Sequence, residues 1–297
     1  MVAVAGRAPH SAAAASTISR VTVAVADTVA APDASADPLL DRAAAYVAAF
    51  ERTFAAVTWR ERYEQEDRMH RRFGSSGSRV MQLVGKRLLE SQLLFVWLPR
   101  EASWIAVRDV MSVDGKAQGD ADRPLQTLSA RGGSISVSEL RTLAAENGRF
   151  NIGGIVRTFN EPTLVLLFLD DRYRSRFAFE PHGEQKLKAG RVRLYRFVER
   201  GRPTVIRSGT RDLPSQGLMG IEPDTGRVLF TSLILMDGAS VQGNLEVEYG
   251  AHADFDVLVP TEMREVYNSV NGEEVTARAT YSDFRRFEAH SRIIVPQ

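Results

Sequence analysis

The sequence predicts an α+β protein that is mainly antiparallel β-structure, with one helix before the strands and a helical insertion between them. Three observations support this fold class. Segments of strand-like alternation recur at intervals of roughly 10–14 residues, turn residues separate them, and the links are too short for parallel crossovers. No linker or shift in composition divides residues 38–297, so we expect a single domain there, built on an open sheet or partial barrel.

The first element is an amphipathic helix in the segment DPLLDRAAAYVAAFERTFAAV, which begins at Asp37. Asp37 can cap the helix, and Pro38 suits the first helical position. Apolar residues then recur at spacings of three and four, so they form one stripe of about five turns that can cover a sheet. The stripe consists of Leu40, Ala43, Val47, Phe50, Phe54 and Val57.

From Val57 onward the period changes to two, which is typical of strands. The first strand places Val57, Trp59, Glu61, Tyr63 and Gln65 on one face. In the next strand Leu93, Phe95 and Trp97 share a face, while Leu94 and Val96 point the other way. A third strand ends at Asp114-Gly115, which is a strong turn signal.

Residues 116–160 read as a helical and loop insertion, and strands follow it to the end of the chain. Ser136 and Glu139 have the spacing of a capping box, and Gly148 suits a helix stop. Later, residues 223–226 form a turn between two strands. In the last strand, alternation places Tyr281, Asp283 and Arg285 on one face and Phe284 on the other.

Residues 1–37 are rich in Ala, Ser, Thr, Val and Pro. Arg20, an apolar stretch and the small residues 34–36 resemble a signal peptide, which predicts a periplasmic or secreted protein. Asp27 interrupts the apolar stretch, so a disordered tail on a cytoplasmic protein is the alternative.

Composition and motifs exclude several classes of function. A formal net charge of +1 gives no reason to expect nucleic acid as a partner, and the absence of Cys excludes a disulfide or thiol nucleophile. The five His residues are scattered, and His252 with Asp254 and Asp256 is the nearest approach to a metal site; we interpret it as a loop. Nucleophile-elbow and phosphate-loop motifs are absent. We therefore expect no enzyme activity, no catalytic or metal-binding residues and no cofactor.

The segment DRMHRRFGSSGSR, residues 67–79, concentrates basic residues around a Gly/Ser loop. We interpret it as a solvated hairpin loop between the first two strands, and the alternative is that it meets anionic headgroups or phosphate. Aromatic residues are too sparse here for a platform that binds single-stranded nucleic acid.

The most apolar run lies within NEPTLVLLFLDD, residues 160–171. Its six consecutive apolar residues, Leu164 to Leu169, are far fewer than the roughly 18–20 that span a bilayer, so we expect no transmembrane helix. Composition fits a short helix or a strand. Because it is apolar on every side, it must be buried all round. It either fills the core or forms the movable wall of a lipid-sized cavity.

The order of the C-terminal motifs resembles a known family. GIEPDTGRVL (220–229), LEVEY (245–249), VLVPTEM (257–263) and ATYSDFRRF (279–287) follow one another after an N-terminal helix. This order resembles the periplasmic lipoprotein-carrier superfamily, typified by the outer-membrane lipoprotein-sorting proteins, and more narrowly an uncharacterised group of bacterial exported proteins. The resemblance implies a strongly curved half-barrel sheet with helices on its concave side, and acyl chains held between them. No carrier residue can be matched to a position here.

We therefore expect a non-enzymatic envelope protein, a monomer, that binds a lipid or a lipidated protein between sheet and helices. An envelope protein is a further expected partner. The alternative is a structural or interaction module whose core is filled by its own side chains. The predicted lipid-binding residues are the bulky apolar ones of the helix, the first two strands and the apolar run: Phe50, Phe54, Trp59, Leu93, Phe95, Trp97, Val165 and Phe168.

Overall fold

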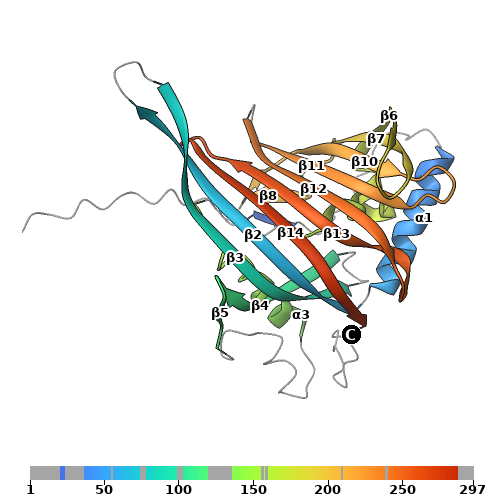
Figure 1. Cartoon of the computed structure of the whole chain (residues 1–297). Coiled ribbons are helices and arrows are strands. Elements are labelled where there is room, and N and C mark those ends of the chain that lie inside the picture. Colours follow the sequence, from blue (N-terminus) through green and yellow to red (C-terminus); the bar gives the residue numbers. More distant parts are fainter. Residues whose placement is uncertain are drawn as a thin grey trace, which may run out of the picture.

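The structure is a computed structural model that describes residues 21–23, 37–54, 56–73, 78–98, 103–119, 136–154, 157, 160–208, 210–237 and 240–286. Eleven antiparallel strands form one open sheet in the order β5-β4-β3-β2-β14-β13-β12-β11-β10-β7-β6. Figure 1 shows its strong curvature, which confirms the predicted fold class. The strands of this sheet are β2 (Ala56–Phe73), β3 (Ser78–Leu98), β4 (Ser103–Val113), β5 (Lys116–Ala117), β6 (Phe177–Lys186), β7 (Arg191–Glu199), β10 (Ser215–Ile221), β11 (Val228–Asp237), β12 (Ser240–His252), β13 (Phe255–Asn268) and β14 (Glu273–Arg286).

A second, small sheet joins β1 (Val21–Val23), β8 (Ile206–Ser208) and β9 (Arg211–Asp212). Val21–Val23 belong to the apolar stretch of the predicted signal segment, and they pair with β8. The remainder of that segment, residues 1–20 and 24–36, lies outside the described residues. None of the helices within the described ranges is both long enough and apolar enough to cross a bilayer.

Helix α1 (Pro38–Thr53) begins where the sequence predicts it. The Asp37 carboxylate accepts a hydrogen bond from the Leu39 backbone N–H at 2.9 Å, and Pro38 is the first helical residue. The predicted stripe is buried, and it faces the sheet around β13. We call the sheet face covered by α1 the inner face and the opposite one the outer face.

The predicted turn at residues 223–226 connects β10 to β11 and contacts α1. Gly226 has a φ of +76°, and a Cβ there would lie 2.7 Å from the Arg42 backbone carbon. Arg42 in turn donates a hydrogen bond to the Pro223 carbonyl at 2.9 Å. Glycine is therefore needed at this turn both for its backbone conformation and for the close approach of α1.

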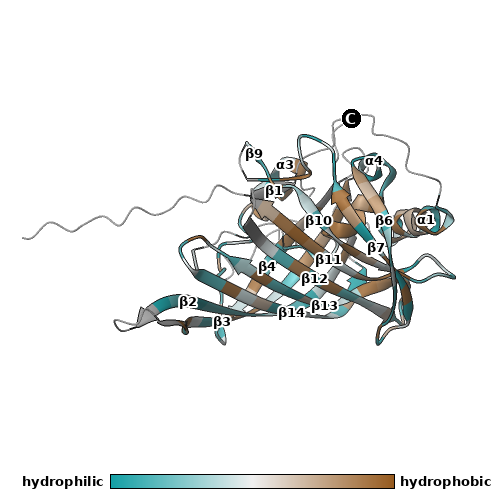
Figure 2. Ribbon diagram, turned by 90° about the horizontal axis from the view of Figure 1, so that it is seen from above, coloured by the Kyte–Doolittle hydropathy of each residue, from teal (hydrophilic) through white to brown (hydrophobic). Residues whose placement is uncertain are grey.

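Strand alternation separates the two faces as predicted. In β2 the residues Val57, Trp59, Glu61, Tyr63 and Gln65 are all buried on the inner face, while the residues between them are mostly exposed on the outer face. Figure 2 shows the same alternation of hydrophilic and hydrophobic positions along the central strands. The predicted turn after β4 is also present, with Asp114 and Gly115 at φ values of +51° and +77°.

The predicted insertion divides between the two faces. Helix α3 (Val137–Ala144) has the predicted capping box between Ser136 and Glu139, but it ends four residues before Gly148, which lies in the turn that follows directly. It packs on the outer face of β3 and β4. The chain then crosses the edge of β4, and Phe150, Ile152 and Leu164–Leu169 lie in the core on the inner face. The outer cluster contains Leu94, Val96, Leu98, Ile105, Val107, Val137 and Leu140.

The apolar run forms a 3-10 helix, η2 (Leu164–Leu169), followed by the single turn α4 (Asp171–Arg174). Of the two alternatives left open by the sequence, the structure has the helical one. All six side chains of η2 are buried, with at most 5% of their surface exposed. They lie in the main core between the sheet and α1.

The alternation predicted at the end of β14 is wrong. Asp283 has a φ of +53°, and the register of β14 against β2 shifts between Ser282 and Arg285. This irregularity lets both Tyr281 and Phe284 turn inward, where 8% and 6% of their surface is exposed. Asp283 stays outside and forms an ion pair with Arg60 at 3.1 Å.

Candidate functional site

The inner face of the sheet has an apolar half and a polar half, and β2 runs through both. Its inward residues are Val57 and Trp59 at one end and then Glu61, Tyr63 and Gln65, all buried. A carrier of hydrophobic ligands needs an apolar surface. In a buried polar surface, by contrast, every charge needs a partner within the protein.

The apolar half contains the predicted lipid-binding residues, in two aromatic clusters. Phe50 and Phe54 of α1 stack at 4.3 Å between ring centroids, and Phe54 lies 5.9 Å from Trp59. Trp59 also lies 5.3 Å from Phe95, and Leu93 belongs to the same core. Each of these five side chains is at most 1% exposed. The structure therefore brings five of the eight predicted residues together.

The second cluster is centred on η2. Phe168 stacks on Phe177 at 4.2 Å and meets Phe197 edge-on at 5.4 Å, while Val165 is buried in the same helix. The side chain of Trp97 lies outside the described residues. The other seven predicted residues are thus divided between the sheet with α1 and the helix η2, and all seven are buried.

One polar atom in the apolar half stands out. The indole N–H of Trp59 is buried, and no hydrogen-bond acceptor within the described part of the chain reaches it. An unsatisfied buried donor costs about 1–3 kcal/mol. The Oγ1 of Thr163, which precedes η2, is in the same situation. Both groups could bond to the polar atoms of a ligand.

The polar half is organised around two buried arginines that sequence reasoning missed. Arg108 of β4 donates hydrogen bonds to Glu61 at 2.7 and 3.1 Å, and its guanidinium lies 5.3 Å from the ring centre of Tyr63. Arg157 donates to Gln65 and lies over the ring of Tyr267 at 5.2 Å. The sequence did contain a signal for these buried arginines. Glu61 and Gln65 occupy inward positions of a strand, and a buried polar side chain needs a hydrogen-bond partner.

A second carboxylate, Glu265 of β13, completes this network. It accepts hydrogen bonds from the hydroxyls of Tyr63 at 3.1 Å and Tyr267 at 2.7 Å. Asn160, just before η2, donates to the Tyr63 hydroxyl at 3.2 Å. Burial raises the pKa of Glu265. The network is buried, and Asn160 links it to the start of η2.

Asn147 holds the insertion to the edge of β4. Its amide donates to the Ala106 carbonyl at 2.6 Å and accepts from the Arg108 backbone N–H at 2.7 Å. These two bonds take the place of a strand partner at residues 106–108, since β5 pairs only with Ser112 and Val113 of β4. They also fix the point at which the chain passes from the outer to the inner face.

Two carboxyl groups flank η2 and have strongly raised pKa values. Burial raises the pKa of Glu161 to about 8. Burial, together with the charge of Asp170, raises the pKa of Glu51 in α1 to about 8. At the contact between α1 and the end of η2, the carboxyl group of Glu51 therefore lies against that of Asp170.

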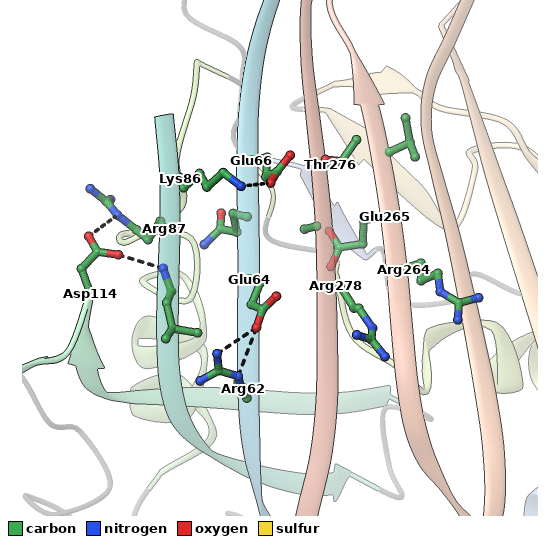
Figure 3. Close-up of a pocket in the computed structure, with 14 residues that line it drawn as sticks. Arg62, Glu64, Glu66, Lys86, Arg87, Asp114, Arg264, Glu265, Thr276 and Arg278 are labelled. Carbon is green, nitrogen blue, oxygen red and sulfur yellow. Dashed lines mark hydrogen bonds and ion pairs between the residues drawn. The ribbon is translucent and has the colours of Figure 1, made fainter. Parts of the chain in front are cut away.

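A hollow of about 550 Å³ lies elsewhere, on the outer face of β3, β2, β14 and β13. Figure 3 shows that charged side chains line it, with Arg62 bonded to Glu64 and Lys86 paired with Glu66. Such a lining does not suit an acyl chain. Nor does any group of His, Asp or Glu in the described ranges have the arrangement of a metal site, and His252 simply pairs with Asp254 at 3.8 Å in the β12–β13 turn.

Comparisons with known proteins give only distant structural likenesses. No protein-family model matches the sequence, and no curated protein matches it significantly. A domain described as an outer membrane lipoprotein-sorting protein from Vibrio parahaemolyticus has a TM-score of 0.37 at 11% identity, over 84% of this chain and 92% of that one. A LolA superfamily protein from Nitrosomonas europaea has a TM-score of 0.34 at 10% identity, over 88% and 95%.

A DUF1329 family protein from Desulfovibrio piger has a TM-score of 0.32 at 10% identity, over 85% of this chain and 95% of that one. The sequence motifs resemble those of lipoprotein-sorting proteins, and proteins described in this way are among the solved structures similar to this chain. At such TM-scores and identities the likeness has no bearing on ligands or site residues. Function has to be argued from the side chains of this chain.

Proposed function

We propose that the protein binds a hydrophobic ligand, such as an acyl chain, on the inner face of the sheet, where η2 now lies. The observation that carries this proposal is η2 itself. It is a six-residue 3-10 helix, all of it apolar and buried, and no side chain caps its start. A helix of this kind has poor backbone hydrogen-bond geometry, so it owes its position to side-chain burial.

A ligand can supply the same burial. Six large apolar side chains contribute about 1.5–3 kcal/mol each, and an acyl chain contributes about 0.8 kcal/mol per buried CH₂ group. A chain of about fifteen CH₂ groups therefore offers burial on the order of 10 kcal/mol, comparable with that of η2. Exchange of the helix for a ligand is energetically balanced, and the free N–H of Trp59 provides a donor for a carbonyl or carboxylate.

In this proposal the lipid-binding residues are Phe50, Phe54, Trp59, Leu93 and Phe95 of the first cluster together with Val165 and Phe168 of η2, which belong to the same core. Movement of η2 opens this core to the ligand. The protein acts without catalysis, as a monomer in the cell envelope, and its ligand is a free lipid or the acyl group of a lipidated protein. The charged network around Arg108 stays in place and supports the sheet.

The test is uptake of a fluorescent fatty acid by the purified full chain, together with native mass spectrometry for a bound lipid. Phe168→Ala removes the ring that holds η2 against Phe177 and Phe197, so we expect several-fold faster uptake. Leu140→Ala is the matched control, because Leu140 is also fully buried but lies in the outer cluster under α3. Both changes should cost about 2–5 kcal/mol of stability.

The proposal is supported if the wild type takes up the fatty acid, Phe168→Ala takes it up faster, and Leu140→Ala takes it up at the wild-type rate. Absence of uptake in all three proteins overturns it. The second candidate, an interaction module with a self-filled core, would then be favoured, since the side chains of η2 and of both aromatic clusters already pack against one another. Equal acceleration by both variants would indicate general loosening and also contradict the proposal.

A further inference from the structure

The large apolar side chains that the structure leaves exposed gather at one end of the sheet. Among the described residues they are Val80, Leu83 and Val84 of β3 and Val270 of the β13–β14 turn, at 48%, 46%, 55% and 95% exposure. The turn adjoins β2, because the His70 N–H donates to the Gly272 carbonyl at 2.9 Å. Single exposed apolar residues are ordinary, but their collection at one end marks an interaction surface.

The hairpin that carries three of these residues extends beyond its neighbours. Strand β14 pairs with β2 only as far as Met69, and β4 pairs with β3 only from Leu89 onward. Residues 70–73 therefore have only residues 78–81 as strand partners, while Gln82 and Leu83 pair with Met69 and Arg68 at the base. Figure 1 shows this part of β2 and β3, residues 70–73 and 78–84, projecting past the sheet. We call it the hairpin extension.

The charge of this region has one sign. Between Arg68 and Gly85 the sequence contains four Arg, one His and no Asp or Glu, whereas the whole chain has a formal net charge of only +1. Arg71 is exposed. Arg68 is paired with Glu66 at 2.6 Å, so the unbalanced charge lies toward the tip.

Aliphatic side chains interspersed with arginines suit an anionic membrane surface. The aliphatic groups can enter the region between headgroups and acyl chains, while the long Arg side chains reach the phosphates. Each basic residue near an anionic membrane contributes about 1 kcal/mol. Val80, Leu83 and Val84 are about half exposed in the folded protein, so they can meet a bilayer without disturbing the core.

We propose that the hairpin extension and the turn at residues 269–272 form a docking surface for an anionic phospholipid membrane. The charge complementarity and the clustering of exposed aliphatic residues favour a lipid surface as the occupant. This inference does not depend on the proposed ligand site, because the docking end lies outside the buried core around η2.

The experiment is co-sedimentation of the full chain with vesicles of phosphatidylcholine alone and of phosphatidylcholine mixed with phosphatidylglycerol. We expect binding to the mixed vesicles only, weakened by salt. Arg71→Glu should reduce the apparent affinity about tenfold or more, since it reverses one charge at the surface. Arg191→Glu makes the same charge change at an exposed position on β7 and should leave the affinity within about twofold.

A second variant keeps the charge and removes the apolar contribution. Leu83→Ser with Val84→Ser should also weaken binding, and because both side chains are about half exposed the melting temperature should hardly change. The proposal is overturned if the wild type ignores mixed vesicles, or if neutral and mixed vesicles bind equally. It also fails if Arg71→Glu and Arg191→Glu behave alike. Failure of fatty-acid uptake would leave these results unaffected.

Discussion

The guanidinium of Arg108 donates two hydrogen bonds to the carboxylate of Glu61, and the two side chains are only 2% and 0% exposed. Arg108 also donates to the Asn147 carbonyl at 3.3 Å, so the pair joins β2 and β4 to the insertion. A charge buried in this way is tolerated because its partner is buried with it.

Arg108→Leu should therefore destabilise the protein by about 3–5 kcal/mol, because it leaves the Glu61 charge buried without a partner. Urea unfolding followed by circular dichroism measures this loss. The control is Arg62→Leu, whose pair with Glu64 is about half exposed and should matter by less than about 1 kcal/mol. Equal losses of unfolding free energy in the two variants would show that burial of the Arg108–Glu61 pair does not increase the cost of breaking it.

The raised pKa of Glu51 predicts that stability falls as the pH rises. Its pKa is about 8 in the folded protein against an ordinary value of 4.5, so the folded state holds a proton that the unfolded state has released between these values. The unfolding free energy should decrease from about pH 4.5 to about pH 8 and level off above that. The groups that act on Glu51 are Asp170, Arg172 and Arg52.

Glu51→Gln tests this directly. We expect a higher melting temperature than the wild type at pH 8 and a nearly equal one at pH 5, measured by differential scanning calorimetry. Each kcal/mol corresponds to about 2–4 °C for a chain of this size. Glu161 contributes in the same direction, so some pH dependence should persist in the variant. A constant difference between the proteins across the pH range would contradict the assignment.

Gly153→Ala should destabilise the protein for two separate reasons. Gly153 has a φ of +83°, and a Cβ there would lie 2.6 Å from a carboxylate oxygen of Glu273 and 2.9 Å from Val275. Gly115→Ala provides the control for backbone strain alone, since Gly115 has a φ of +77° and nothing within 4 Å of its Cβ position. Urea unfolding should show the larger loss for Gly153→Ala. A smaller or equal loss would mean that the insertion tolerates displacement from β14.

Tyr249→Phe should loosen η2 without removing apolar surface. The Tyr249 hydroxyl donates to the Pro162 carbonyl at 2.5 Å, just before η2 begins. Its loss leaves a buried carbonyl unpaired at a cost of about 1–3 kcal/mol. We expect faster hydrogen exchange of the backbone amides of residues 164–169, measured by mass spectrometry. Tyr267→Phe, which removes a bond to Glu265 instead, should leave these amides nearly unchanged.

Local patterns predicted the elements whose formation depends on neighbouring residues. The capping of α1 by Asp37, the capping box at Ser136 and the Asp114-Gly115 turn follow from short-range backbone chemistry, and all three are present. Alternation along β2 also placed Glu61 and Gln65 correctly on the buried face. Alternation failed in β14, because Asp283 takes a left-handed conformation that no pattern announced.

The candidate site was predicted only in part. Hydrophobicity identified residues that are buried, such as Phe54 and Phe168, but burial does not tell which cluster a residue joins. Whether any of them touches a ligand stays a prediction. Arg108 and Arg157 could not be recognised as buried from the sequence. An arginine side chain is almost always exposed unless a buried partner is paired with it, and the sequence does not show which residue that partner is.

The sequence by itself determined the class of fold and the apolar character of residues 164–169, because periodicity and composition decide which side chains must leave water. Only the tertiary structure decided that this run is a 3-10 helix on the inner face, that α3 covers the outer face, and that Glu61 and Glu265 are matched with distant partners. These outcomes depend on contacts between residues up to 202 positions apart, such as Tyr63 and Glu265. Local propensity contains no information about such contacts.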